Sequence, residues 1–233
     1  MQCRLPRMQT MVKMPSVFSD ATWEQIISAC QSNRVPSTWA VGDSKTMVIK
    51  GKDYQIDIIG KNHDTYAAGG TAPLTFQMHE CYGTRYSMNS RGSSENYNLW
   101  QNSTMRTSTL PALLNEMPIE VQAAIKEISK QTGQGKTSSD LIATSEMLFL
   151  LSAAEVFGEE EATSDAAAGE GTQYEYYAAG NSKIKNLSGT AAGWWLRSPV
   201  ASNFAEYHFV RATGVLYTAT MNGNSGVAFG FCF

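Results

Sequence analysis

The chain has 233 residues, of which 42% are hydrophobic and 17% are charged, and its formal net charge at pH 7 is -3. This length is enough to bury a sizeable core, in one large domain or two small ones. Because no basic field is present to attract a phosphate backbone, nucleic acid is excluded as an expected partner. The longest apolar run, Met147–Leu151, is far too short to span a bilayer, so we expect no membrane insertion.

Residues 1–19 are predicted to be an N-terminal arm or attachment segment. They are rich in methionine and contain two prolines, which is typical of irregular chain outside a packed domain. They carry basic residues but no long hydrophobic stretch of a signal peptide, so we expect synthesis in the cytoplasm. The globular domain is therefore predicted to span residues 20–233.

The hydrophobic spacing predicts mixed secondary structure along this domain. It indicates a helix over 20–30, a hairpin with strands 46–50 and 54–59, a strand over 74–78, and helices over 104–114 and 119–131. Residues 159–171 are acidic and rich in alanine and glycine, which predicts a mobile loop. Helices in the first two-thirds and strands in the last third indicate an α+β class with an antiparallel sheet and long loops.

The segment from Gly193 to Pro199 is predicted to anchor the core. Trp194 and Trp195 are adjacent, and a buried indole N–H needs an acceptor, so a well-built core is expected around them. Arg197 follows in the same apolar context and is expected to find carboxylate or carbonyl partners. We assign these three residues to the scaffold, and we expect a structural role for Arg106 on the same grounds.

The following stretch, residues 200–226, has the composition of an adaptable binding surface. Aromatic side chains supply rigid contact area, and Asn, Ser and Thr supply short hydrogen-bonding groups. The expected ligand-binding positions are Asn203, Phe204, Tyr207, Phe209, Arg211, Thr213, Leu216, Tyr217, Thr218, Thr220, Asn222 and Asn224. The alternative is that these are ordinary hairpin residues of an antiparallel sheet, and composition alone does not decide between the two.

Two pairs of residues could carry acid–base or nucleophilic chemistry. His63 and Asp64 lie in a loop after a strand, and His79 and Cys81 would share one face of a strand. A lone loop histidine is more often a structural hydrogen-bonding group, and no third orienting group accompanies His79. We therefore expect no catalytic residue.

We also expect no metal and no cofactor. The four cysteines, Cys3, Cys30, Cys81 and Cys232, lie far apart without metal-ligand spacing and are predicted to be free thiols. The run Glu159–Glu161 lacks the alternating oxygen ligands of a calcium loop and is expected to be a solvated charge run.

Several motifs, in order, resemble a family found in gut bacteria and their prophages, often among tail or surface proteins. They are 39–43 (WAVGD), 58–64 (IIGKNHD), 88–89 (MN), 103–106 (STMR), 148–152 (LFLLS), 155–158 (EVFG), 194–199 (WWLRSP) and 226–227 (GV). The C-terminal half also resembles the C-type-lectin-like fold, which is shared by formylglycine-generating-type domains and by variable proteins of diversity-generating retroelements.

The resemblance implies a phage or prophage tail-tip adhesin that binds a protein or polysaccharide on a target cell. Its C-terminal segment would be a display surface diversified by a retroelement, and its N-terminal arm would join other tail proteins, for which a homotrimer is suitable. The location would be the virion or the bacterial surface. The alternatives are a formylglycine-generating-type or glycan-acting enzyme, for which the paired active-site cysteines lack a counterpart here, and a purely structural tail or surface component.

Overall fold

The computed structural model describes residues 14–89, 99–162 and 165–233. Its class is α+β, and each pairing between the named strands is antiparallel, as predicted. The helices are α1 (Trp23–Gln31), α2 (Leu110–Leu114), α3 (Ile119–Ala124), α4 (Ala153–Phe157), α5 (Glu159–Ala162) and α6 (Glu175–Ala178), and a π-helical turn, Met105–Thr109, leads into α2.

The strands form two larger sheets and three two-stranded ribbons within the described ranges. The larger sheets have the orders β1-β2-β3-β13 and β11-β10-β9. The strands are β1 (Ser44–Ile49), β2 (Lys52–Lys61), β3 (Leu74–Met78), β4 (Tyr86–Ser87), β5 (Ile128–Gly133), β6 (Leu141–Glu146), β7 (Lys185–Leu187), β8 (Thr190–Ala192), β9 (Trp194–Pro199), β10 (Glu206–Val210), β11 (Leu216–Thr220), β12 (Asn224–Ser225) and β13 (Gly230–Cys232).

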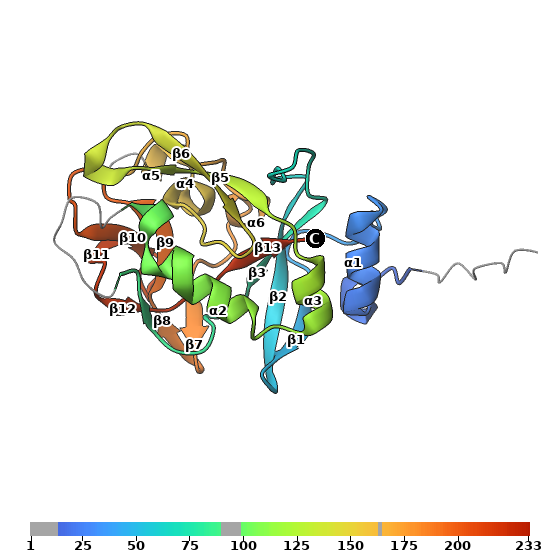
Figure 1. Cartoon of the computed structure of the whole chain (residues 1–233). Coiled ribbons are helices and arrows are strands. Elements are labelled where there is room, and N and C mark those ends of the chain that lie inside the picture. Colours follow the sequence, from blue (N-terminus) through green and yellow to red (C-terminus); the bar gives the residue numbers. More distant parts are fainter. Residues whose placement is uncertain (1–13, 90–98, 163–164) are drawn as a thin grey trace, which may run out of the picture.

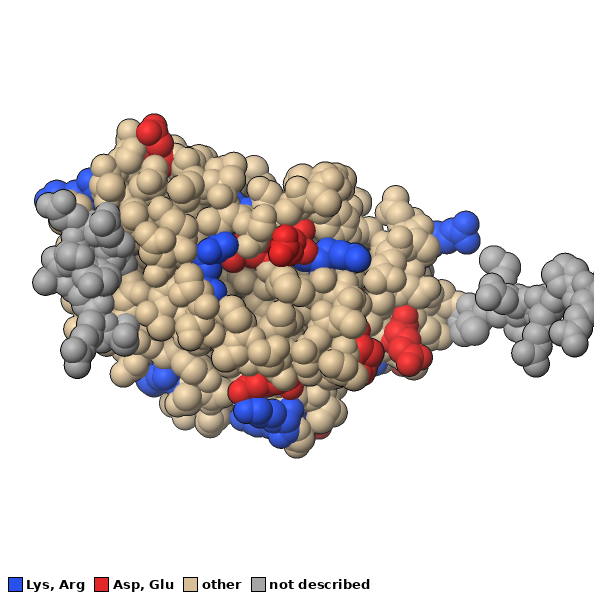
Figure 2. Space-filling view, viewed as in Figure 1, with Lys and Arg blue, Asp and Glu red and all other residues tan. Residues whose placement is uncertain are grey.

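The molecule is elongated in the view of Figure 1, with α1 at one end and β10 and β11 at the other. The four-stranded sheet lies next to α1 and α3, and the C-terminal strand β13 lies near the middle. Figure 2 shows acidic and basic side chains interspersed on the face in view. None of the described helices has the length and hydropathy needed to cross a membrane.

The predicted hairpin is confirmed by the pairing of β1 with β2, in which Ile49 lies opposite Lys52. Lys50 and Gly51 form the two-residue turn, and both have positive φ, as a primed hairpin turn requires. The predicted strand 74–78 is confirmed as β3. The first helix begins at Trp23 rather than at residue 20, because Thr22 forms the capping box with Gln25.

The predicted helix over residues 119–131 is wrong in its second half. The helix α3 ends at Ala124, and β5 then pairs with β6 through six successive residues. Along β5, Ile128, Lys130 and Thr132 are buried while the residues between them are exposed. Alternation with a period of two is the pattern of a strand and does not fit a helix, and the pairing with β6 uses it.

The predicted boundary between arm and domain also needs correction. Phe18 is buried against Trp39, with ring centroids 5.3 Å apart, and the Trp39 indole N–H donates to the Pro15 carbonyl at 3.1 Å. Residues 14–19 therefore belong to the packed domain. Residues 1–13 of the expected arm lie outside the described residues.

The acidic stretch 159–171 is more structured than its composition predicts. It begins with the short helix α5, and Glu170 near its end is buried. Residues 163 and 164 lie outside the described ranges. The predicted mobile loop therefore contains a carboxylate that belongs to the core.

Candidate ligand-binding surface

The scaffold residues on β9 are buried, as predicted from their sequence context. The Trp194 indole N–H donates to the Lys183 carbonyl at 2.9 Å, and that of Trp195 donates to the Tyr86 carbonyl at 2.7 Å. These two bonds satisfy both indoles and tie β9 to distant parts of the chain.

Arg197 extends from β9 into a buried ionic cluster. Its guanidinium group donates to both carboxylate oxygens of Glu155, at 2.5 and 3.0 Å, and to the carbonyl oxygens of Leu150 and Glu170, at 2.9 and 2.6 Å. Burial by itself would raise the pKa of Glu155, but the positive charges of Arg197 and Lys130 outweigh this effect and lower the pKa to about 2. Glu155 is therefore a carboxylate at neutral pH.

Lys130 connects this pair to a second carboxylate. Its ammonium group lies 2.5 Å from Asp64, 2.7 Å from Glu155 and 2.7 Å from the Tyr174 hydroxyl, which in turn donates to Asp64. We call Asp64, Lys130, Glu155 and Arg197 the ionic cluster. It joins the segment after β2 to β5, α4 and β9, and so couples the two larger sheets.

Glu170 lies beside the ionic cluster. Its carboxyl group accepts from the Gly133 backbone N–H at 2.7 Å and from the Ser198 hydroxyl. Burial raises the pKa of Glu170 to about 7, although Arg197 and these hydrogen bonds act in the opposite direction.

We expect Glu170 to make stability fall as the pH rises from about 4.5 to 7. Over this range the unfolded carboxyl group has lost its proton while the folded one keeps it, so each rise in pH favours the unfolded state. The free energy of unfolding, measured with urea, should fall between pH 5 and pH 8 by about 2–3 kcal/mol more in the wild type than in Glu170→Gln.

Glutamine retains an acceptor for Gly133 and cannot titrate, which makes it the matched variant. His79, whose pKa is raised by its hydrogen bond to Asp57, contributes with the same sign but is present in both proteins. Equal losses for wild type and variant would contradict a protonated Glu170.

The three-stranded sheet β11-β10-β9 carries a row of aromatic side chains. Phe209 on β10 lies between Trp195 on β9 and Tyr217 on β11, with ring-centroid distances of 5.9 and 6.2 Å. The Arg211 guanidinium carbon lies 3.4 Å from the centroid of the Tyr217 ring. We call Trp195, Phe209, Arg211 and Tyr217 the aromatic row.

A groove of about 250 Å³ lies against this row. Its lining includes Arg85, Phe209, Arg211, Ala219, Asn224 and Ser225. Gly193 also lines it, and a Cβ atom there would lie 2.9 Å from the Phe209 ring, so glycine is required for that ring to pack in place. The groove thus combines β10 and β11 with β12 and with the residue that precedes β4.

The structure brings only some of the predicted ligand-binding residues to this groove. Phe209, Arg211 and Asn224 line it, and Tyr217 stands beside it with half of its surface exposed. Thr213, Thr220 and Asn222 are exposed outside the lining.

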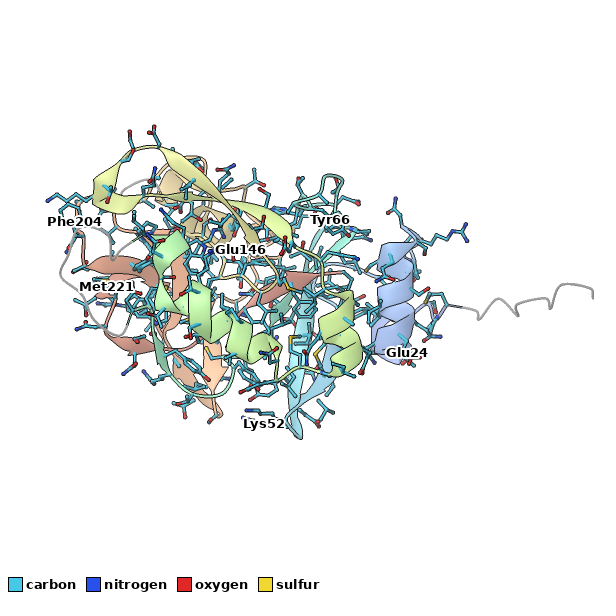
Figure 3. All side chains as sticks on the ribbon, in the orientation of Figure 1. Glu24, Lys52, Tyr66, Glu146, Phe204 and Met221 are labelled. Atoms are coloured by element: carbon cyan, nitrogen blue, oxygen red, sulfur yellow. The ribbon has the colours of Figure 1, made fainter. Side chains whose placement is uncertain are left out.

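Four further predicted residues lie elsewhere at the same end of the molecule. Leu216 and Thr218 line a different pocket, next to His208, and Tyr217 borders that pocket as well. Asn203 and Phe204 precede β10, where the Lys136 ammonium group lies 5.0 Å from the centroid of the Phe204 ring. Figure 3 places Phe204 and Met221 at the end of the molecule that is farthest from α1.

The prediction that Tyr207 is an exposed ligand-binding residue is wrong, because its side chain is 0% exposed. It lies on the middle strand of its sheet, opposite Pro199 on one side and Ala219 on the other. Its neighbour His208 is also buried, so β10 is covered on both faces in this part and does not alternate between core and solvent.

The candidate catalytic pairs do not assemble. The His63 ring stacks on Tyr174, with centroids 4.0 Å apart, while Asp64 belongs to the ionic cluster. His79 contacts Asp57 at 2.7 Å. Cys81 is buried, and burial raises its pKa to about 11, so its thiol stays protonated at neutral pH.

Arg106 and the cysteines are the other side chains for which metal or ligand chemistry was considered. Arg106 donates to Glu146 at 2.7 Å, in agreement with a structural role. Cys30, Cys81 and Cys232 are free and buried, while Cys3 lies outside the described residues. In the part of the chain that the structure describes, no group of three or more His, Cys, Asp or Glu residues could hold a metal ion.

Sequence reasoning missed several residues that build this region. Arg85 and Ser225 reach the groove by long-range pairing of β4 with β12, which no local pattern reveals. Glu155 lies within apolar surroundings in the sequence, and this was a usable signal for the ionic cluster, whereas Lys130 is flanked by Ser129 and Gln131 and gives no such signal. Glu170 was hidden in a stretch whose composition resembles a loop.

Comparison with known proteins gives a family but no activity. Residues 74–232 match the family described as "Domain of unknown function (DUF6273)", and the chain belongs to this family. No curated protein and no solved structure matches the chain.

Proposed function

We propose that this protein is a ligand-binding protein and that the aromatic row with its groove is the contact surface. The observation that carries the proposal is Tyr217, which is 50% exposed yet held in place by Arg211 on its face and by Phe209 at its edge. An aromatic side chain that is ordered before binding loses little conformational entropy when a ligand packs against it.

The support beneath the surface suits this role. Trp195 belongs to both the buried scaffold and the aromatic row, and Arg197 on the same strand is fixed by the ionic cluster. A rigid base of this kind lets exposed side chains change without unfolding the core. This arrangement agrees with a C-type-lectin-like domain that displays a surface diversified by a retroelement, which is the finer form of the proposal.

The placement of the ends supports a tail-tip or surface adhesin. The first described residues pack near α1, at the end of the molecule opposite β10 and β11 (Figure 1). Attachment through the N-terminal end would therefore point the groove away from the particle or cell that carries the protein. The partner would be a protein or polysaccharide on a target cell.

The enzyme alternative has weaker support. Burial raises the pKa of the Cys232 thiol, as it does for Cys81. The rings of His63 and His79 contact Tyr174 and Asp57. A thiol nucleophile needs the thiolate and a nearby base.

The proposal is tested with fluorescently labelled protein and a panel of intact gut bacterial strains. We expect saturable binding to at least one strain, and we expect the double variant Arg211→Ala/Tyr217→Ala to lose at least tenfold in affinity with an unchanged melting temperature. The control is Val48→Ala, which truncates an exposed side chain on β1. Unchanged binding by the double variant, or no binding of the wild type to any strain, would contradict the proposal.

A further inference from the structure

The groove beside the aromatic row is lined by two arginines that have no acidic partner among the described residues. Arg85 and Arg211 are both exposed and both line it, and no acidic residue is among the described residues of its lining. Neither arginine makes an ion pair with another described residue. The chain as a whole has a net charge of -3, so this local excess of positive charge runs against the overall composition.

The Arg211 side chain leaves its hydrogen-bonding edge available. Its guanidinium carbon lies over the Tyr217 ring, 3.4 Å from the centroid, and it makes no side-chain hydrogen bond to a described residue. Stacking uses the face of the guanidinium group and leaves its N–H donors at the rim. A planar fork of donors fixed in this way matches the two oxygens of a carboxylate.

The rest of the groove suits a hydroxyl-rich ring. Phe209 lines the groove and Tyr217, which stands beside it, adds exposed aromatic surface. The C–H face of a sugar ring is apolar enough to pack on such a surface. Asn224 and Ser225 in the lining supply short donors and acceptors. The volume of about 250 Å³ is below that of pockets that enclose drug-sized ligands, so the groove fits one unit of a longer chain.

We infer that the groove binds an acidic polysaccharide, with a sugar carboxylate between Arg85 and Arg211 and its ring against Tyr217. This inference rests on the proposed function and names the ligand class of the same surface. An acidic protein segment would satisfy the arginines equally but would leave the sugar-sized groove and its amide and hydroxyl rim without a role.

The probes for the test are oligogalacturonate, hyaluronan oligosaccharide and polysialic acid, measured by titration calorimetry with the full chain. We expect at least one to bind, with affinity that falls as salt rises. Methyl esterification of the bound probe, which removes the charge and keeps the sugar backbone, should reduce affinity at least tenfold. Arg85→Gln and Arg211→Gln should each do the same.

The matched control is Lys52→Gln, which removes an exposed cation from the β1–β2 hairpin, far from Phe204 and Met221 (Figure 3). The inference is overturned if none of the three probes binds, if the esterified probe binds equally well, or if poly-glutamate binds as tightly. Cell binding that depends on Tyr217 but not on Arg85 would overturn this inference alone and leave the proposed function in place.

Discussion

Replacing Arg197 with methionine is expected to lower the free energy of unfolding by about 3–5 kcal/mol, because it breaks a buried ion pair and leaves one partner behind. Arg197 is 0% exposed and makes two bonds to Glu155. Without it, the Glu155 carboxylate keeps Lys130 as its charged partner, and the carbonyl oxygens of Leu150 and Glu170 lose their guanidinium donor.

The loss should be visible in urea unfolding of the purified variant. Arg197→Lys keeps the charge but cannot donate along two parallel bonds, so it should recover only part of the stability. The matched control is Arg106→Met, whose ion pair with Glu146 lies nearer the surface and should cost clearly less. Equal losses at positions 106 and 197 would contradict the special importance of the ionic cluster.

Tyr207→Ala is expected to cost about 3–5 kcal/mol, because it empties a fully buried aromatic site. Tyr217→Ala should cost less than about 1 kcal/mol, because half of that side chain already faces solvent. Both residues are tyrosines on neighbouring strands of the same sheet, where Tyr207 lies opposite Ala219 and Tyr217 lies opposite Phe209. The comparison therefore separates the effect of burial from that of residue type.

Tyr207→Phe provides an internal check. The Tyr207 hydroxyl is buried and has no hydrogen-bond partner among the described residues, so removing it should leave stability unchanged or raise it slightly. Thermal unfolding of the three variants measures these differences. A small loss for Tyr207→Ala, or a loss for Tyr207→Phe near that of alanine, would show that this side chain is not packed as described.

Local patterns were sufficient for parts of the fold. The turn chemistry of Gly51 and the alternation around it predicted the β1–β2 hairpin, because both act within a few residues. The adjacent Trp194 and Trp195 indicated a core, since two indoles are costly to leave exposed. Residues 128–131 were misassigned because Ile125 and Ile128 fit a helical stripe, and only pairing with β6 excludes it.

The residues of the candidate site could be predicted where the composition of the segment indicates exposed side chains. Phe209, Arg211 and Tyr217 were identified because aromatic and polar residues are mixed in their segment. Tyr207 was misjudged because the same segment forms a middle strand, which sequence alternation does not reveal. Arg85 was missed because it reaches the groove through contacts between residues far apart in the chain.

The central claim is that one short segment contains both buried support and a separable contact surface. It is tested most directly by a substitution scan of residues 203–225, in which each displayed variant is scored for folding and for binding to a target strain. We expect Tyr207, His208, Val210 and Met221, which are buried, to lose folding and binding together. Substitutions at Arg211, Tyr217 and Asn224 should lose binding while folding is kept. If binding were lost only where folding is lost, the surface would have no role of its own and the account would be wrong.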